Sequence, residues 1–199
     1  MTPEHVKYAA FYDLEEMKVK ITRRLFIVPL ANNDHGKSTM LKALVALGIS
    51  KEMQIHRKGV RAMFSPFANR MVDAYVFGRS FQEKEKGKHG SVESALDSND
   101  PDWRKRELVI MPSHVAAADH PDIQDMIDAA HSAGFDAVAA SVILSWDGGD
   151  NRADFPEVWQ MPWDERWTIP NPWSDNNPQA QLEALGRELW TRIARKLAL

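Results

Sequence analysis

The chain has 199 residues, of which 44% are hydrophobic and 27% charged, and this composition excludes a fibrous or disordered protein and suits one α/β domain with a sizeable core. Its formal net charge of −3 gives no overall attraction to nucleic acid or to an anionic membrane, although contact of a local basic patch with nucleic acid stays open. The absence of cysteine excludes disulfides, thiolate zinc sites and a cysteine nucleophile.

The sequence contains no signal that would direct the chain to a membrane. No apolar run reaches the length of a membrane span, and acidic residues stand near the N-terminus, where a signal peptide would be apolar. We therefore expect a cytoplasmic protein without a membrane span. No internal repeat or linker divides the sequence, so we expect one domain over residues 1–199.

The first expected element is a helix at residues 3–18. Its apolar residues form a ragged face, on which the aromatic side chains either pack against the core or contact a protein partner or a second copy of the chain. Both interpretations stay open from the sequence.

A short apolar strand at residues 25–28 leads into a loop that contains glycine, and a helix follows that ends near Gly48. Residues 31–38 match the phosphate-binding pattern G-x-x-x-x-G-K-[ST] at every position except the first, where Ala31 replaces glycine. Ala31 is tolerated where its φ angle is negative. Strand, loop and helix are the context that this pattern requires, and an ordinary turn rich in Asn and Gly is the alternative.

The residues of this loop, which we call the glycine loop (residues 31–38), suit the chemistry of phosphate binding. Backbone N–H groups there and at the following helix start point toward phosphates, and Gly36 permits their close approach. Lys37 brings a cation to the β and γ phosphates, and the Ser38 hydroxyl suits a Mg²⁺ ion. Asp34 opposes this chemistry, because a carboxylate beside phosphates is unfavourable unless it faces outward or touches a cation or base.

On these residues the chain resembles the P-loop nucleoside triphosphatase superfamily, and the specific part of the resemblance covers residues 25–47. The resemblance implies an α/β three-layer fold with a mostly parallel sheet, and ATP or GTP with Mg²⁺ as ligands. ATP is favoured, because the sequence lacks the Asn/Thr-Lys-x-Asp element with which such proteins usually recognise guanine. The implied nucleotide contacts are Asn32, Asn33, Asp34, His35, Gly36, Lys37, Ser38 and Thr39.

Beyond the first helix, residues 53–55 and 60–64 are two candidates for a second strand, and a helix is expected from Pro66 through Phe77. The segment that follows, residues 79–107, carries interleaved charges and few large apolar side chains, so we expect it to be exposed and partly mobile. It serves as a plain solvated surface, as a lid or substrate-binding segment of a kinase, or as an arm that binds a partner or nucleic acid. The cations to test first are Arg79 and Arg104.

We expect the next buried strand at residues 108–111, then a helix at 122–132 and a strand at 137–144, which together form a crossover unit of a mostly parallel sheet. The first of these strands ends in a Pro-Ser-His turn, where a P-loop protein commonly has an acidic residue that holds Mg²⁺. His114 in this turn is either a base or phosphate donor, or a structural residue. Asp147, just beyond the second strand, either replaces the missing carboxylate or belongs to a surface turn.

The segment at residues 150–177 is rich in tryptophan and proline, which either cover a nucleotide base or pack the segment onto the sheet. It contains a last expected strand at 166–169, after which Asn171 is a candidate base contact by resemblance to the loop that approaches the base in P-loop proteins. A closing helix is expected at 179–197, because leucine and isoleucine recur there at helical spacing.

The sequence thus predicts Mg²⁺-dependent nucleotide binding, with hydrolysis that switches loops and changes the affinity for a partner. In this hypothesis Lys37, His114 and Asp147 are catalytic, and Ser38 and Asp147 hold the metal. A small kinase or phosphotransferase and a non-catalytic interaction module are the alternatives. The glycine loop alone does not distinguish among the three.

Overall fold

The computed structural model describes most of the chain, and every structural statement below concerns the part that it describes. The predicted helix at 3–18 and the predicted strand at 53–55 lie outside this part. The described residues are 23–33, 35–51, 58–143, 155–170 and 177–199.

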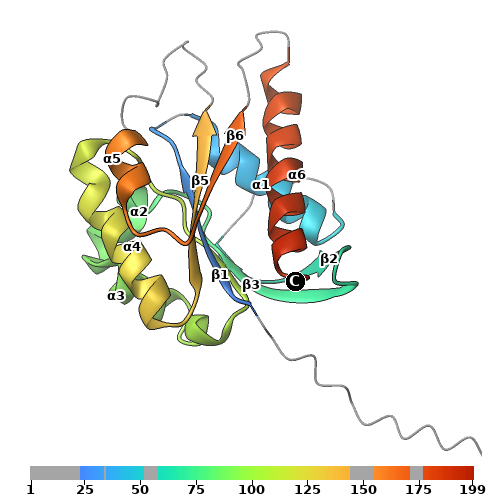
Figure 1. The fold of residues 1–199 in the computed structure, drawn as a ribbon, viewed down its shortest axis with the longest axis horizontal. Coiled ribbons are helices and arrows are strands. Elements are labelled where there is room, and N and C mark those ends of the chain that lie inside the picture. The colour runs from blue at the N-terminus through green and yellow to red at the C-terminus, as the bar shows by residue number, and fades with distance from the viewer. Residues whose placement is uncertain (1–22, 34, 52–57, 144–154, 171–176) are drawn as a thin grey trace, which may run out of the picture.

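A six-stranded, mostly parallel sheet forms the centre of the molecule (Figure 1). The strand order is β2-β3-β4-β1-β5-β6, so that β1 pairs in parallel with β4 on one side and with β5 on the other. Only β2 runs antiparallel to its neighbour among the described strands. The strands are β1 (Leu25–Leu30), β2 (Gly59–Ser65), β3 (Arg70–Val76), β4 (Leu108–Ile110), β5 (Asp136–Ile143) and β6 (Glu165–Pro170).

Helices cover both faces of this sheet (Figure 1). On one face lie α1 (Lys37–Gly48) and α6 (Pro178–Lys196). Two short 3-10 turns, η1 (Trp103–Lys105) and η2 (Ala117–Asp119), lie in the connections between elements. None of the helices in the described part of the chain combines the length and the apolar character that a bilayer crossing requires. The helices of the other face are α2 (Phe81–His89), α3 (Val92–Asn99), α4 (His120–Ser132) and α5 (Phe155–Gln160).

The central strand β1 contributes to a hydrophobic core on each face. Successive strand side chains point to opposite faces, and Leu25 and Ile27 accordingly pack in the core beneath α1 and α6. Phe26 and Val28 pack in the core beneath α2, α3 and α4. All six residues of β1 are buried, which is why the strand reads as a continuous apolar run. The architecture is α/β and is compatible with the predicted three-layer arrangement.

Several predicted elements are confirmed. The strand and helix around the glycine loop are β1 and α1, and the predicted crossover unit is β4, α4 and β5, with β1 lying between its two strands. The last strand and the closing helix are β6 and α6. The helix α5 is an element that the sequence did not indicate, and Trp163 and Trp167 are buried, in agreement with the packing role of these tryptophans.

The predicted helix from Pro66 through Phe77 is wrong, because this part of the chain forms the second arm of a β-hairpin. Strand β3 pairs antiparallel with β2 over its whole length, and Asn69 in the connecting turn has a φ of 48°. Val72, Ala74 and Val76 pack in the core beneath α1 and α6, whereas Tyr75 packs in the core on the other face. This period of two is the strand pattern, and it outweighs the helical interpretation.

The prediction that residues 79–107 are exposed is confirmed for many of their polar side chains, whereas their partial mobility stays a prediction. The segment forms α2, α3 and η1, and it buries its few large apolar side chains: Phe81, Val92, Leu96 and Trp103. The Trp103 ring stacks on Phe135 with 5.9 Å between centroids, and its indole N–H donates to Asp97. These few buried side chains hold the segment against the core although its overall composition is charged. Its charged side chains also pair with residues of other elements, as Arg106 does with Asp73 and Asp100.

The helices α1 and α6 approach closely at Gly186. A Cβ atom at this position would lie 2.5 Å from the carbonyl oxygen of Met40, 2.8 Å from Ala43 Cβ and 3.0 Å from Leu44 N. Backbone atoms cannot move away as a flexible side chain can, so glycine is required for this packing. The start of α1, which follows the glycine loop, is thereby fixed against α6.

We expect Gly186→Ala to lower the free energy of unfolding by about 1–3 kcal/mol, because the added methyl group overpacks the contact between the helices. Gly87→Ala is the matched control, since nothing lies within 4 Å of a Cβ at that position in α2. This control should raise stability by about 0.5–1 kcal/mol through helix propensity. Urea unfolding followed by circular dichroism measures both, and equal stabilisation by the two substitutions would contradict the close approach.

Candidate functional site

The glycine loop folds around the ammonium group of Lys37. The Nζ atom donates hydrogen bonds to the carbonyl oxygens of Ala31, at 2.7 Å, and Asn32, at 2.6 Å. Lys37 is only 5% exposed although it is the first residue of α1. Its positive charge is therefore held in a fixed place at the carboxyl end of β1.

The backbone conformations at Gly36 and Ala31 explain why the phosphate-binding pattern needs glycine at the first of these positions but tolerates alanine at the second. Gly36 has a φ of 78°, a left-handed conformation, and a Cβ there would overlap the side chain of Leu182 on α6. Among the described non-glycine residues, only Ser50 and Asn69 have a positive φ. Ala31 thus has an ordinary backbone conformation, and it lies in the core, so alanine fits the first position of the pattern.

The N-terminus of α1 carries no competing anion within the described residues. Its N-cap is Gly36, which has no side chain to cap the helix, and the first turn contains no acidic residue. The first N–H groups of a helix and its macrodipole give this end a partial positive charge. The end of α1 is therefore suited to an anionic ligand.

A cavity of about 840 Å³ opens in front of the loop. Helix α1, which follows β1, and helix α2, which follows β3, lie on opposite faces of the sheet, and residues of both line the cavity at the carboxyl ends of these strands. One wall of the cavity consists of loop residues 33 and 35–37, with Ser38, Thr39 and Lys42 of α1. The opposite wall includes Lys58, Phe77, Arg79, Glu83, Lys84 and Glu85.

The lining of this cavity is basic, although the chain as a whole is acidic. It contains five Lys or Arg side chains and two carboxylates. Glu85 is already neutralised, since its oxygens contact Lys58 Nζ at 2.6 Å and Asn99 Nδ2 at 2.8 Å. Burial of Glu85 opposes its ionisation, but these hydrogen bonds and the charge of Lys58 prevail and lower its pKa. An excess of positive charge thus remains for an anionic ligand.

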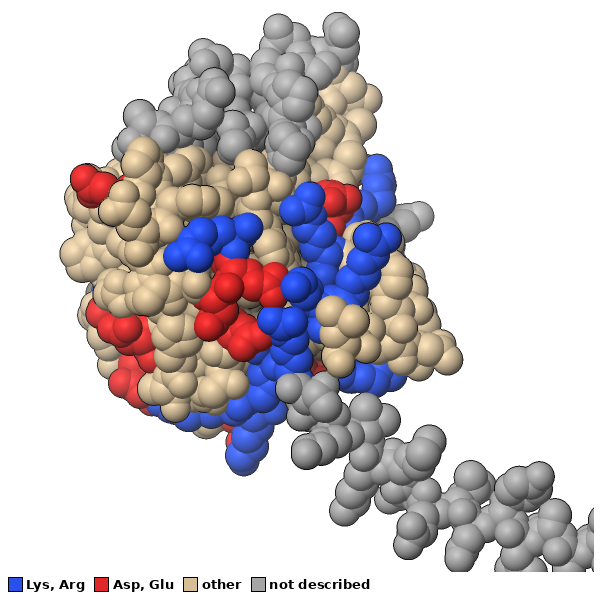
Figure 2. Space-filling model, viewed as in Figure 1, with Lys and Arg blue, Asp and Glu red and all other residues tan. Residues whose placement is uncertain are grey.

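Other parts of the surface show charges of both signs together. Figure 2 shows a face on which basic side chains gather beside a group of acidic ones. Ion pairs join Arg23 to Asp136 and Glu165, each at 2.6 Å, and Lys196 to Glu165 at 2.8 Å. Such balanced networks leave little net attraction for a ligand, in contrast to the cavity.

A polar cluster connects α2 to the end of β4 beside the cavity. Gln82 donates from Nε2 to Ser113 Oγ at 2.9 Å and to Asp122 at 3.0 Å, and its Oε1 accepts from the backbone N–H of His114 at 3.1 Å. The His114 Nε2 atom lies 3.6 Å from Glu83 Oε1. Gln82 therefore fixes the turn after β4, and His114 lies next to a carboxylate that lines the cavity.

His114 is held in its neutral form. Burial disfavours the imidazolium, and the nearby charge of Lys37 disfavours it further, so the pKa of His114 lies below its usual range. Asp119 and Glu83 act in the opposite direction with smaller effect. This influence of Lys37 also indicates that the turn after β4 lies close to the glycine loop.

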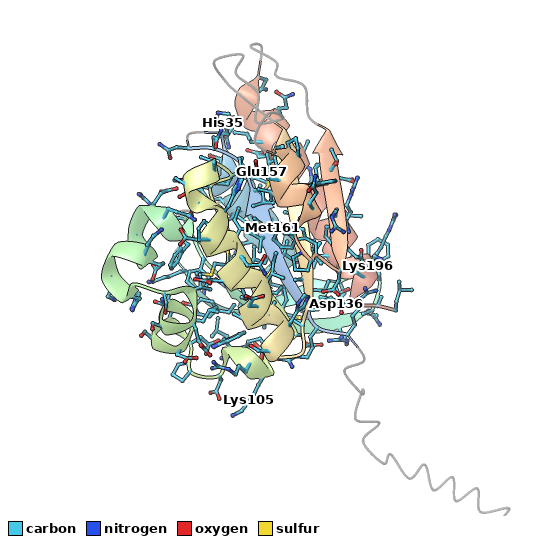
Figure 3. The ribbon with its side chains drawn as sticks, turned by 60° about the vertical axis from the view of Figure 1, so that its left-hand side comes forward. His35, Lys105, Asp136, Glu157, Met161 and Lys196 are labelled. Carbon is cyan, nitrogen blue, oxygen red and sulfur yellow. The ribbon has the colours of Figure 1, made fainter. Side chains whose placement is uncertain are left out.

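The structure brings most of the predicted loop residues together. Asn33, His35, Gly36, Lys37, Ser38 and Thr39 line the cavity, and Asn32 contributes the carbonyl group that binds Lys37. Figure 3 shows His35 at one end of the molecule and Lys105 and Asp136 at the other. Three predicted site residues lie outside the described part of the chain: Asp34, Asp147 and Asn171.

The two arginines chosen from the charged segment have different positions. Arg79 lines the cavity, whereas Arg104 pairs with Glu93 and Asp97 and lies over the Trp103 ring. Arg104 therefore belongs to the packing of α3 and η1.

The described residues include no group of three or more His, Asp or Glu side chains placed to hold a metal ion. Of the two predicted metal ligands, Ser38 lines the cavity, and its hydroxyl is an oxygen ligand of the kind that Mg²⁺ prefers.

Seven residues of the cavity lining were not singled out from the sequence: Lys42, Lys58, Phe77, Gly78, Glu83, Lys84 and Glu85. For the cavity residues on α2, the spacing of Phe81 and Glu85 was the available sequence signal. These two residues are four positions apart, and both are buried on one side of the helix. Lys58 reaches the cavity through the tertiary fold, and its local sequence contains no signal for this position.

Comparisons of the chain with family models, with curated proteins and with solved structures returned no match.

We expect His114→Gln to reduce the loss of stability on acidification. The pKa of His114 is lower in the folded state than in the unfolded chain. As the pH falls through about 6.5, the unfolded chain therefore binds a proton at this histidine before the folded chain does. The folded state is destabilised until the pH has fallen below the folded-state pKa. Urea unfolding at pH 7.5 and 5.5 should thus show a larger decrease for the native chain than for His114→Gln. His131→Gln on the surface of α4 is the control, and identical decreases for the native chain and His114→Gln would contradict the buried neutral imidazole.

Proposed function

We propose that the chain binds ATP with Mg²⁺ at the glycine loop and hydrolyses it. The observation that carries this proposal is the fixed ammonium group of Lys37, held by two loop carbonyls at the N-terminus of α1 and open to a basic cavity. Backbone N–H groups and a fixed cation are the two features with which proteins bind a row of phosphates. The geometry therefore supports a nucleoside triphosphate rather than an uncharged ligand.

In this proposal the Ser38 hydroxyl and Asp147 hold Mg²⁺, and Asn171 contacts the base. The ion, when bound, would spread the negative charge of the phosphate oxygens and so stabilise the charge that develops during hydrolysis. Lys37 adds a positive charge on the opposite side of the phosphates. ATP is preferred to GTP because the sequence lacks the usual guanine-binding element.

Glu83 is the best candidate to accept the proton during hydrolysis. The described cavity lining contains two carboxylates, and Glu85 is already bound by Lys58 and Asn99. We therefore infer that Glu83 takes a proton from a water molecule while the oxygen of that water molecule forms a bond to the γ-phosphorus. The bond from that phosphorus to the bridging oxygen breaks, and ADP leaves with the electron pair. His114 Nε2 lies 3.6 Å from Glu83 Oε1, next to this carboxylate.

Hydrolysis in this scheme changes the contacts of α2. Loss of the γ-phosphate removes an anion from between the glycine loop and α2, so the position of α2 responds to the state of the nucleotide. We propose that a protein partner senses this change, and that the protein works in the cytoplasm. A phosphotransferase is the second candidate, which the basic side chains on the α2 wall favour.

We expect Lys37→Ala to weaken ATP binding by about 10- to 100-fold, because a charge-assisted contact to phosphate is lost. Lys37 is buried and bonded to the loop, so the unfolding midpoint must be measured alongside. Lys51→Ala, at an exposed position after α1, is the control. Calorimetry with ATP and GTP, with and without Mg²⁺, tests both variants, and a native chain that binds neither nucleotide would instead be an interaction module.

We expect Glu83→Gln to slow ATP hydrolysis by about 10²- to 10⁴-fold, the usual loss when a general base is removed. The affinity for ATP should be equal to or higher than that of the native chain, because the neutral amide replaces a group that repels phosphate. Glu93→Gln on the surface of α3 is the matched control. Undiminished phosphate release by Glu83→Gln would show that another group accepts the proton.

A further inference from the structure

The α2 wall of the cavity carries cations that the glycine loop does not use. Arg79 and Lys84 line this wall, and Lys42 lines the cavity from α1. Lys37, by contrast, is held within the loop by Ala31 and Asn32. The positive charge of the cavity therefore has two separate parts, one at the loop and one across from it.

The cations of this second part are available for a ligand. Lys58 is committed to Glu85, but Lys42 and Lys84 have no ion-pair partner within the part of the chain that the structure describes. Arg79 Nη1 lies 3.8 Å from Glu83 Oε2, and its side chain is 71% exposed, so this pair is weak and holds the guanidinium loosely. Arg and Lys without strong partners at a cavity wall are the usual means of binding phosphate.

We propose that the α2 side of the cavity binds a second, phosphate-bearing small molecule through Arg79 and Lys84 while ATP occupies the glycine loop. The proposal rests on the proposed binding of ATP at the glycine loop, and it favours the second candidate function, phosphoryl transfer, over hydrolysis. The cavity of about 840 Å³ has the size of a pocket for a drug-sized ligand, and Arg79 and Lys84 lie on the wall opposite the glycine loop. Such a ligand is the acceptor that a phosphotransferase requires.

The same wall argues against an extended polyanion such as a nucleic acid strand. Glu83 and Glu85 stand between and beside the cations along α2, and a backbone with regularly spaced phosphates would meet these carboxylates. A single phosphate group can instead lie against Arg79 and Lys84 alone. The alternation of charges thus selects a small ligand.

The test is a titration of inorganic phosphate into the full chain that is already saturated with Mg²⁺ and the non-hydrolysable analogue AMPPNP. The native chain should bind phosphate under these conditions. Arg79→Gln and Lys84→Gln should each weaken this binding by about 10-fold, as expected for loss of a charge-assisted contact, and should leave the affinity for AMPPNP unchanged. Lys88→Gln is the matched control, because Lys88 lies one turn further along α2 and does not line the cavity.

Three results would overturn the proposal. Phosphate that fails to bind the AMPPNP-saturated chain would show that the cavity holds one ligand only. Variants that lose affinity for AMPPNP would show that Arg79 and Lys84 bind the phosphates of the nucleotide itself. Binding of a single-stranded oligonucleotide that depends on both cations would assign the wall to nucleic acid.

Failure of the proposed function has a different signature, since AMPPNP itself would not bind. Phosphate is then titrated into the chain alone and into Lys37→Ala. Binding that depends on Arg79 and Lys84, and is unaffected by Lys37→Ala, would retain the second phosphate site. Binding that depends on Lys37 would reject it.

Discussion

The parallel pairing of β1 with β4 on one side and β5 on the other is the constraint on which the site depends. It places the start of the glycine loop beside the turn after β4, where Ser113 N–H donates to the carbonyl of Pro29 and Ala31 N–H donates to that of Ser113. Helices α1 and α4 leave these adjacent strands toward opposite faces of the sheet, the arrangement in which open α/β sheets bind ligands. The cavity thus follows from the strand order, and the loop supplies its chemistry.

In the described part of the chain, charged side chains are paired at the amino ends of the strands, whereas cations without such partners lie at the carboxyl ends. At the amino ends of the strands, Arg106 is bound by Asp73 at 2.7 Å and by Asp100 at 2.8 Å, and it stabilises the contact of β3 with the segment before β4. At the carboxyl ends, Lys42 and Lys84 project into the cavity without such partners among the described residues. A chain with a net charge of −3 can therefore present a local positive field to an anion, which the net charge alone would not indicate.

The strand, loop and helix around Lys37 could be predicted from the sequence because each is encoded locally, by a continuous apolar run, a glycine with positive φ and helical periodicity. The position of His114 beside Glu83 could not, since it requires β4 to pair with β1 and α2 to pack against the end of β4. The positions of Arg79 and Arg104 could not be predicted from the sequence either. Both lie in one charged segment, but only the arrangement of α2, α3 and η1 brings the first to the cavity and the second to Trp103.

The loop geometry also bears on how a phosphate would be recognised. An exposed lysine loses side-chain entropy when it binds a ligand, by about 1.5–2 kcal/mol for a fully immobilised chain. Lys37 has already lost this freedom, because the carbonyls of Ala31 and Asn32 hold its ammonium group. The folding of β1 and α1, and the packing of α6 against Gly36, supply the free energy that keeps it there. A phosphate would then meet a preorganised charge, which is the condition under which electrostatic binding and catalysis are most effective.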